Sequence, residues 1–409
     1  MGFAERPASH GANQTRNGQT NYMRLKLILP VVEAEKYSKP EECPFGCGGN
    51  EYWRRQEVKK HVRDTQHDEV TVRRYECLTC RHTFRVYLQG VSQDHFSQRV
   101  KGMAVMLYVL GLSYGAVALM LEALGIWIGK STVYETVQMV AEHVPGMKQK
   151  KLLEGYRTRA LGADLTSVKC KGQWLPIGVT VDAITGMTLS IDDLSGEDAQ
   201  TLKAWLAPIV EAVDACVLVS DDADALKTAA DDNGLEHQVC KSHVGRNTEA
   251  LVEQMLMSLT HAREPSLEQI GVSIEQARLD VQRLQELIRL RQPEARDELE
   301  AMYQRYRAAK ASPQGKPASL AYRLRNLLLD RWNLWPRLTF YRTWKDATGR
   351  EILDGTNNAT ERAIGWWVKE RYRSMRGYKR IQSALNVSRL IAYCGNHLSN
   401  GLQLAALIG

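Results

Sequence analysis

The spacing of apolar residues changes along the chain, and the changes divide it into segments with different expected structures. From Arg157 to Leu194 the period changes, and three runs have the pattern of strands: TRALGADLTSV, WLPIGVTVDA and MTLSIDDL. A period of two is typical of strands with one buried face. The dipeptide Thr185-Gly186 separates the last two runs, so we expect these two runs to form a hairpin.

The following segment alternates between helix-like and strand-like patterns. Glu197 to Val213 predicts an amphipathic helix, ACVLVS a short buried strand, Asp222 to Asn233 another helix and LEHQVC another strand. A meander of three strands followed by this alternation predicts an α/β fold with a mixed sheet.

Long helical stretches are predicted elsewhere. From Val244 to about Asp346 the chain is charged and helical in pattern, and IEQARLDVQRLQELIRLRQ has a period of 3.6 residues. Lys310 to Pro317 interrupts this pattern with Ser, Pro and Gly. Residues 95–150 and 357–407 also have helical patterns.

The beginning of the chain has a different composition. Residues 1–22 are rich in Gly, Asn, Gln and Thr, which is typical of disorder. This start lacks the apolar core of a signal peptide, and no run reaches the ~18 uninterrupted apolar residues that a membrane helix needs. We therefore expect a cytoplasmic protein with no membrane partner, in which thiols stay reduced.

Four of the eight cysteines form two closely spaced pairs, Cys43-x3-Cys47 and Cys77-x2-Cys80. Two short loops that each present two thiolates can close a tetrahedral zinc site. We predict a zinc ribbon over residues 23–92, in which Zn²⁺ is structural because four cysteines leave no open position for water. The alternative is four unrelated buried cysteines. Three histidines are rival ligands that we expect at the surface: His61, His67 and His82.

A helix-turn-helix is predicted over residues 93–150. Ser113 to Ala123 forms a first helix, Gly125 to Lys130 a tight connection, and Thr132-x-x-Glu135 a capping box that opens the next helix. A plain helical hairpin would have the same pattern. If the second helix enters a major groove, the residues nearest the bases are Ser131, Thr132, Tyr134 and Glu135.

Positive charge gathers near the end of the chain. The 409 residues carry a formal net charge of +7, and Glu361 to Leu390 contains six Arg and two Lys against two Glu. This density favours a polyanionic partner, although a solvated helix face would look the same.

One acid, Glu361, heads this basic stretch in TNNATERAIGWW. Asp164 lies on the first predicted strand and Asp221 ends the strand CVLVS. If these strands are neighbours, both carboxylates meet at one end of the sheet, where a helix can add Glu361. Two or three carboxylates suffice for Mg²⁺, and two ions ~4 Å apart support phosphodiester chemistry. The basic residues after Glu361 would then bind phosphates.

Two of the three acids also have a purely structural explanation. Asp221 can cap the helix that follows it, and Asp222 or Asp224 can replace it as a ligand. Glu361 lies three residues after Asn358 and can be the last member of a capping box.

The order zinc ribbon, helix-turn-helix, Asp, Asp, Glu resembles the DDE transposases of bacterial insertion sequences. VLVSDDADALKTA resembles their second-aspartate motif, in which an apolar strand and a small hydroxyl residue precede the acid. VCKSHVGRN is similar to the Cys-x2-His segment that follows in Mutator-like and related families. TNNATERAIGWWVKERYRSMRGY resembles the Asn-rich, Glu-Arg signature around the third carboxylate. The likeness covers about Cys43 to Arg389, and the last segment is its most specific part.

The resemblance implies a ribonuclease H-like core at residues 151–243 and 347–409, interrupted by a helical insertion domain at 244–346. It also implies Mg²⁺- or Mn²⁺-dependent cleavage and joining of DNA, with Asp164, Asp221 and Glu361 as catalytic metal ligands. Arg362 is expected beside the scissile phosphate. The further phosphate contacts are expected at Lys369, Arg371, Arg373 and Arg376.

Two other groups of residues have open interpretations. Cys240 and His243 can bind a metal, but two ligands make no closed site, so we prefer packing or positioning near the active site. Trp366 and Trp367 can stack on unpaired bases, although core packing is the preferred interpretation. No GxxxxGK[ST] loop is present, so we expect no nucleoside triphosphate.

The leading hypothesis is a nucleoid-associated transposase that binds double-stranded DNA at element ends and at the target. We expect a homodimer or a higher oligomer, because two ends must be held together. The alternatives are a DNA-binding regulator with an inert acidic triad and a nuclease of the same fold that cuts without joining. Fold alone does not separate these functions.

Overall fold

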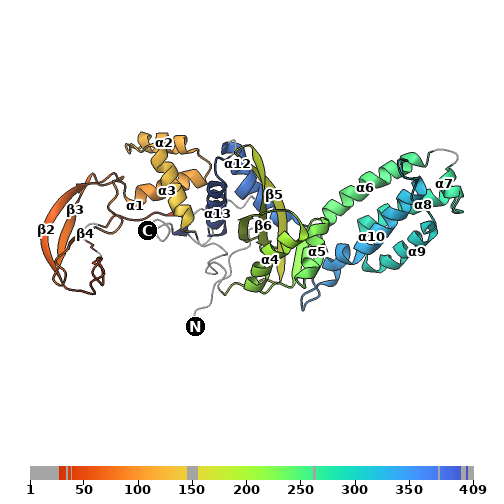
Figure 1. The fold of residues 1–409 in the computed structure, drawn as a ribbon, viewed down its shortest axis with the longest axis horizontal. Helices are drawn as coiled ribbons and strands as arrows, with labels where there is room; N and C mark the ends of the chain where they lie inside the picture. Colours follow the sequence, from red (N-terminus) through yellow and green to blue (C-terminus); the bar gives the residue numbers. More distant parts are fainter. Residues whose placement is uncertain are drawn as a thin grey trace. The chain divides into compact units, whose positions relative to one another are not determined.

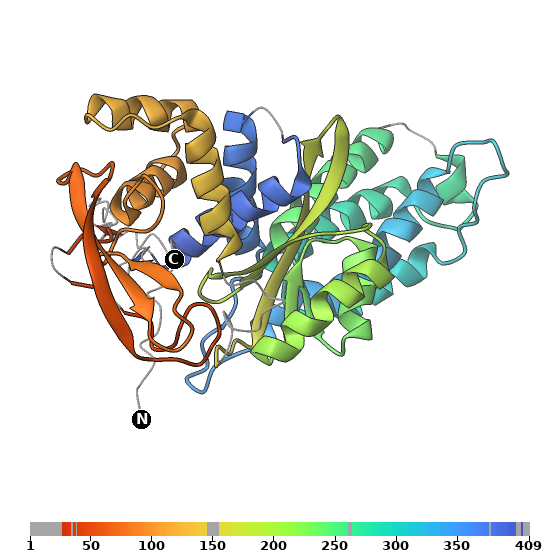
Figure 2. The same ribbon diagram turned by 60° about the vertical axis from the view of Figure 1, so that its left-hand side comes forward.

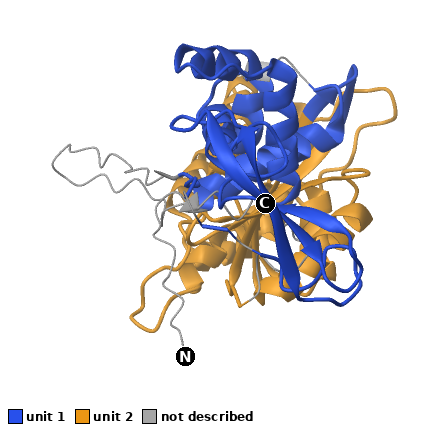
Figure 3. Cartoon of the chain, turned by 90° about the vertical axis from the view of Figure 1, so that its left-hand side faces the viewer, with its two compact units in different colours: residues 1–152, 168–175, 365–409 blue, residues 153–167, 176–364 orange. Residues whose placement is uncertain are grey.

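The computed structural model describes residues 27–33, 36–37, 39–144, 155–260, 264–375, 378–397 and 402–403 (Figure 1). The predicted disordered segment 1–22 and Arg376 lie outside the described residues. The chain divides into two compact units, one formed by residues 1–152, 168–175 and 365–409 and the other by residues 153–167 and 176–364 (Figure 3).

The cysteine-containing part of the first unit is a three-stranded antiparallel sheet. β2 (Tyr52–His61) pairs with β3 (Glu69–Cys77), which pairs with β4 (Thr83–Val86). Charged residues fill much of β2 and β3, so no continuous alternation of apolar and polar residues marks these two strands in the sequence. Cross-strand ion pairs join β2 to β3, from Lys59 to Glu69 and from Arg73 to Glu57. The short strands β1 (Leu27–Ile28) and β10 (Leu402–Gln403) pair in parallel.

Four helices of the first unit share one apolar core. These helices are α1 (Gln98–Val109), α2 (Tyr114–Ala123), α3 (Lys130–Glu142) and α13 (Ile381–His397). The fourth lies in the segment 347–409 that the sequence analysis grouped with the α/β core. In the structure, Val387, Leu390 and Cys394 of α13 pack with the residues of α1–α3. The predicted helix-turn-helix segment is thus completed by a helix from the end of the chain.

The predicted capping box at Thr132 is wrong. The first helix of the pair begins as expected, because Ser113 accepts a hydrogen bond from the N–H of Ala116. However, α3 begins at Lys130 behind Gly129, which makes no side-chain cap. Ile126 and Ile128 of the connection are buried, and this burial fixes where the chain enters the helix. Thr132 therefore lies within the first turn.

The second unit contains most of a five-stranded mixed sheet with the order β7-β6-β5-β8-β9 (Figure 2). The strands are β5 (Ala160–Cys170), β6 (Gln173–Asp182), β7 (Thr188–Asp193), β8 (Val217–Ser220) and β9 (Glu236–Val239). β5, β8 and β9 run parallel, and β6 and β7 form the predicted hairpin. Gly186 in its turn has a φ of 78°, which glycine adopts at little cost. The mixed α/β fold is therefore confirmed.

Two helices follow the hairpin as the sequence predicted. They are α4 (Ala199–Val213) and α5 (Asp224–Asp232). α4 lies against β6 where Gly178 makes room for the ring of Trp205. A Cβ atom at Gly178 would lie 2.5 Å from that ring, so the close approach of helix and strand requires glycine.

The stretch between β9 and residue 343 is helical, as its periodicity predicted. Its helices are α6 (Lys241–Ser258), α7 (Pro265–Glu268), α8 (Ile274–Leu290), α9 (Arg296–Tyr306) and α10 (Leu320–Thr343). They surround a continuous apolar core that includes Leu284, Leu299 and Trp335. The buried Asp280 is held by hydrogen bonds from Arg305 and Tyr306.

The chain then enters α11 (Asn358–Ala363), a π-helix (Ile364–Lys369) and α12 (Glu370–Met375). None of the helices in the described part of the chain is both long and apolar enough to cross a membrane.

Candidate metal-binding and catalytic site

Asp164 and Asp221 occupy equivalent positions on neighbouring parallel strands. β5 and β8 pair in the register Ala160 with Val217 and Gly162 with Val219. Asp164 and Asp221 each lie two residues beyond the last of these pairs. Because adjacent strands are ~4.8 Å apart, the two carboxylates leave the same edge of the sheet side by side. Asp221 directly follows the carboxyl end of β8, where α/β proteins bind ligands, whereas β5 continues beyond Asp164 to Cys170.

Hydrogen bonds and close packing hold helix α11 against the part of the sheet that carries Asp164 and Asp221. Asn357, at its start, donates from its side chain to the carbonyl of Ala163 at 3.3 Å, and its backbone N–H donates to the Sγ atom of Cys240. Thr360 lies over Gly162, where an added Cβ atom would be 2.5 Å from the threonine Oγ1 atom. These contacts bring Glu361, which follows Thr360, to the strand ends that carry the two aspartates.

The electrostatics of Asp164 are those of a carboxylate among other acids. Burial, together with the negative charges of Asp221 and Glu361, raises the pKa of Asp164 to about 6. The N–H of Leu165, which donates to Asp164 Oδ1 at 2.7 Å, and the nearby His243 act in the opposite direction. Asp164, Asp221 and Glu361 are therefore close enough for their negative charges to interact.

The rival structural roles of the acids do not match the geometry. Asp222 and Asp224 both form ion pairs with Lys227, at 3.0 and 2.7 Å, whereas the carboxylate of Asp221 accepts a local hydrogen bond from the N–H of Ala223. α5 has Ala223 as its N-cap, so Asp221 is not its capping residue.

Glu361 is not part of a capping box either. The N-cap of α11 is Asn357, and Glu361 lies four residues after it rather than three. Its side chain is 41% exposed.

Cys240 and His243 lie near the same acids, as one of the preferred interpretations of the sequence expected, but their grouping with Glu361 was not expected. In the β8–β9 register Ser220 pairs with Val239, so Cys240 is the counterpart of Asp221 on the next strand. His243 lies one turn into α6, and its Nε2 atom is 3.7 Å from Glu361 Oε1. The Cys-x2-His spacing was the signal in the sequence that pointed to these two residues, but Glu361, the third member of the group, is distant in the sequence.

A chain of hydrogen bonds supports the strand that carries Asp221. Arg337 of α10 donates to His237 Nδ1 at 3.0 Å and forms two bonds to Asp231. Since an arginine only donates, His237 carries its proton on Nε2 and donates to Ser220 Oγ at 2.8 Å. Burial lowers the pKa of His237 to about 3, so its ring stays neutral.

The four cysteines of the first unit converge in a separate cluster that could hold a structural metal such as zinc. The Sγ atoms of Cys43 and Cys80 are 3.7 Å apart, and those of Cys47 and Cys77 are 3.6 Å apart. Zn–S bonds of ~2.3 Å in a tetrahedron place sulfur atoms roughly 3.8 Å apart. Backbone N–H groups, chiefly that of Cys80, lower the pKa of Cys77 to about 6. The rival ligands His61, His67 and His82 are not members of this cluster.

The predicted DNA-reading residues of α3 differ in exposure. Ser131 and Glu135 are exposed and Thr132 is half-buried. Tyr134 is half-buried, bonds to Ser383 of α13 at 3.1 Å and packs edge-on against Tyr114. Because Tyr134 packs in the helical core, less of its side chain is exposed for contacts with bases.

The predicted phosphate contacts also differ. Arg362, Lys369 and Arg373 are exposed. Arg371 is only 4% exposed, and its guanidinium group stacks 4.0 Å from the ring centre of Tyr108. Because Arg371 is buried in the helical core, we do not include it among the residues expected to contact phosphates.

The tryptophan pair divides between surface and core. Trp366 is 56% exposed, whereas Trp367 packs on the core of the four helices and lies against Gly395. Trp174, which the sequence analysis did not single out, is 62% exposed and lies 6.2 Å from the ring of Tyr372.

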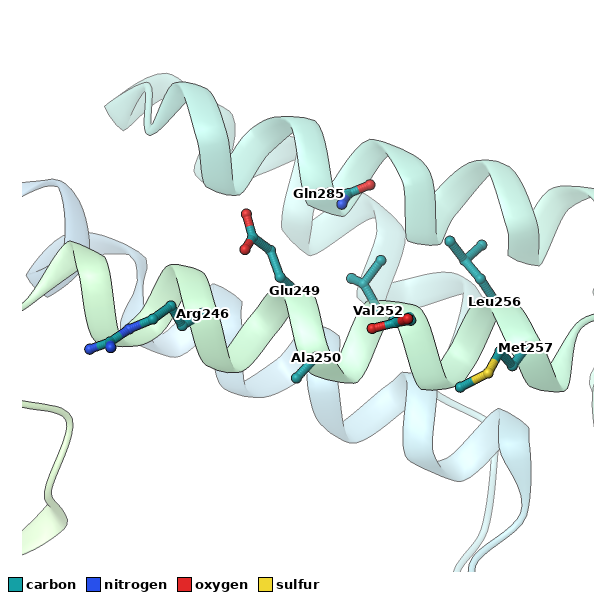
Figure 4. A pocket seen from close by; sticks show the side chains of 8 residues that line it. Arg246, Glu249, Ala250, Val252, Leu256, Met257 and Gln285 are labelled. Carbon is teal, nitrogen blue, oxygen red and sulfur yellow. The ribbon is translucent and has the colours of Figure 1, made fainter.

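A hollow of about 570 Å³ lies along α6, opposite α8 (Figure 4). Glu249, Val252 and Leu256 line it from α6 and Gln285 from α8. None of its lining residues belongs to the group of acids, so it does not extend the candidate site.

A scan of the chain against protein-family models finds no match, and a search of curated proteins finds none either.

Proposed function

We propose that this protein is a DNA transposase that cleaves DNA strands at the ends of an insertion sequence and joins them to a target. The observation that carries the proposal is the shared edge of β5 and β8, where the in-register Asp164 and Asp221 are joined by Glu361 of α11. A regulator needs no such concentration of carboxylates, because it performs no phosphodiester chemistry.

In this proposal Asp164, Asp221 and Glu361 hold Mg²⁺ or Mn²⁺. When bound, these ions would activate the attacking hydroxyl and neutralise charge on the leaving oxygen. The aspartates are positioned by the strands, and Asn357 fixes the approach of Glu361 through its bonds to Ala163 and Cys240. Arg362, the next residue of α11, is exposed and would contact the scissile phosphate.

DNA binding is assigned to the first unit. We propose that β2–β4 with the cysteine cluster form a zinc ribbon and that α2 and α3 act as a helix-turn-helix. The sheet and its long helical insertion would correspond to a ribonuclease H-like core. The cations expected to contact phosphates are Lys369 and Arg373, both exposed.

The test is incubation of the full-length protein with double-stranded DNA that carries candidate element ends, with and without Mg²⁺. We expect Mg²⁺-dependent nicking followed by covalent joining to target DNA. Asp164→Asn should bind the same DNA and fail to cleave it. Binding without metal-dependent turnover would favour a regulator, and cleavage without joining would favour a nuclease.

A further inference from the structure

We propose that Cys240, His243 and Glu361 form a second zinc site in this protein, separate from the four-cysteine cluster. Zinc bound there would withdraw Glu361 from the two aspartates. Binding of the ion does not depend on the DNA chemistry, whereas its effect on cleavage rests on the proposed function.

The first support is geometric. The ligand atoms of Cys240, His243 and Glu361 all lie within 4.8 Å of one another, although the glutamate is more than a hundred residues away in sequence. Bond lengths of 2.0–2.3 Å around tetrahedral zinc place ligand atoms roughly 3.3–3.8 Å apart. The 3.7 Å from His243 Nε2 to Glu361 Oε1 is too long for a hydrogen bond and falls within that range.

The second support is the state of the individual donors. Cys240 is fully buried, and its Sγ atom accepts a hydrogen bond from the N–H of Asn357, an interaction that stabilises a thiolate ligand. The Nδ1 atom of His243 is buried without a hydrogen-bond partner in the described part of the chain. No hydrogen bond from Nδ1 to a described residue orients the imidazole ring of His243, so coordination to a metal ion would fix its orientation.

The third support is the chemistry of the donor set. Thiolate, imidazole and carboxylate are the ligands that zinc takes in proteins, and three of them leave a fourth position open. Mg²⁺ instead requires oxygen ligands. The edge of the sheet thus offers a hard set, Asp164 with Asp221, and a soft pair, Cys240 with His243. Glu361 lies within reach of both, so the two kinds of ion would compete for it.

The distinguishing measurement is the zinc content of the full-length protein. The protein is equilibrated with micromolar Zn²⁺, freed of unbound metal and analysed by mass spectrometry. We expect two zinc ions per chain in the wild type and one in Cys240→Ser and in His243→Ala. Asp164→Asn is the matched control, because it removes a neighbouring carboxylate that is not a zinc ligand, and it should retain two.

A single zinc ion in the wild type would overturn the proposal, as would two ions in Cys240→Ser. Retention of one ion by Cys240→Ser, with an unchanged melting profile, excludes misfolding as the cause of the loss. Co²⁺ provides an independent signal. The wild type minus Cys240→Ser difference spectrum should contain a thiolate-to-cobalt charge-transfer band, and its absence would contradict ligation by this sulfur.

The regulatory consequence has its own readout. Micromolar Zn²⁺ added to a reaction that contains millimolar Mg²⁺ should slow wild-type cleavage at least tenfold. If the protein cleaves no DNA under any condition, the proposed function fails while the zinc count still tests the site. If it cleaves DNA and Zn²⁺ has no effect, the competition for Glu361 is refuted.

Discussion

At Asp164 the stability of the fold and the proposed chemistry have opposite requirements. Its pKa is raised to about 6, mainly by burial and further by Asp221 and Glu361. The folded protein therefore binds a proton at this carboxyl more tightly than the unfolded chain, whose pKa is near 3.8. Above pH 6 the ionised carboxylate destabilises the fold, and below pH 3.8 this penalty is absent.

Replacement of Asp164 by Asn should therefore stabilise the metal-free protein. At pH 8 in a chelator we expect Asp164→Asn to increase the free energy of unfolding by ~1–3 kcal/mol, because a neutral side chain avoids the penalty. The asparagine can still accept the hydrogen bond from the N–H of Leu165. Thermal unfolding between pH 3 and pH 8 measures the difference, which should vanish at the acidic end. A variant that is less stable than the wild type at pH 8 would contradict this.

At the scale of elements, the packing of α11 against β5 decides whether Glu361 reaches Asp164 and Asp221. Gly162 and Thr360 are so close that a single methyl group at the glycine would collide with the threonine and with Val181. The collision would push α11 away from the strand.

Gly162→Ala should thus abolish metal-dependent cleavage even though it changes no acid. We expect a loss of at least a hundredfold in the cleavage rate, with DNA binding retained. Gly245→Ala is the matched control, because Gly245 lies in α6 with open space around its Cβ position. The control should keep its activity and gain ~0.5–1 kcal/mol of stability. Equal activity of the two variants would show that the fit of α11 on β5 is unimportant.

The three-stranded sheet around the four cysteines depends on metal in this account. Its apolar core is small, and charged residues occupy much of β2 and β3, so burial alone supports it weakly. Removal of zinc by a strong chelator, or Cys77→Ser, should unfold β2–β4 while the helical and sheet regions persist. Amide hydrogen exchange would detect this as rapid exchange confined to residues 52–86. Unchanged protection there would argue against a structural metal.

Elements with a regular apolar period could be predicted from the sequence, and elements fixed by charge or long-range contacts could not. Alternation revealed the β6–β7 hairpin, and the 3.6-residue period revealed α8. The strand β2 was missed because Arg, Lys and Glu mask its alternation. The start of α3 was misplaced because two buried isoleucines of the connection, rather than the local capping signal, fix it.

The candidate site was predictable in part for the same reason. Asp164 lies on a strand with a recognisable pattern and Asp221 directly follows another, so their meeting could be inferred if the two strands are neighbours. Glu361 depends on a helix that returns after a long insertion; its position at the head of a basic stretch suggested it, and the resemblance of its segment supported it. The convergence of Cys240 and His243 with Glu361 is a property of three-dimensional packing that no local spacing reveals.

At the scale of the whole molecule, the excess of positive charge should make DNA binding dependent on salt. Lys369 and Arg373 are exposed cations, and Arg373 is paired only loosely with Glu370 at 3.8 Å. Lys369→Ala and Arg373→Ala should each weaken binding to all DNA sequences and reduce the slope of log affinity against log salt by about 1. Titrations by fluorescence anisotropy at several salt concentrations measure this. Unchanged slopes would remove these residues from the DNA-binding surface.

Assembly is the other property of the whole molecule that the proposal predicts. Two element ends must be held together for joining, so the protein should form a homodimer or a higher oligomer on DNA. Light scattering of the complex with end DNA should give at least two chains per complex. A complex with one chain that still joins ends would contradict this expectation.

Mn²⁺ binding tests most directly whether three acids that are distant in the sequence bind one group of divalent ions. Free Mn²⁺ is followed by electron paramagnetic resonance during titration of the full-length protein. We expect Asp164→Asn, Asp221→Asn and Glu361→Gln each to weaken Mn²⁺ binding at least tenfold. Asp222→Asn should bind like the wild type, because Asp222 is paired with Lys227. Wild-type affinity in any of the first three variants would contradict the account.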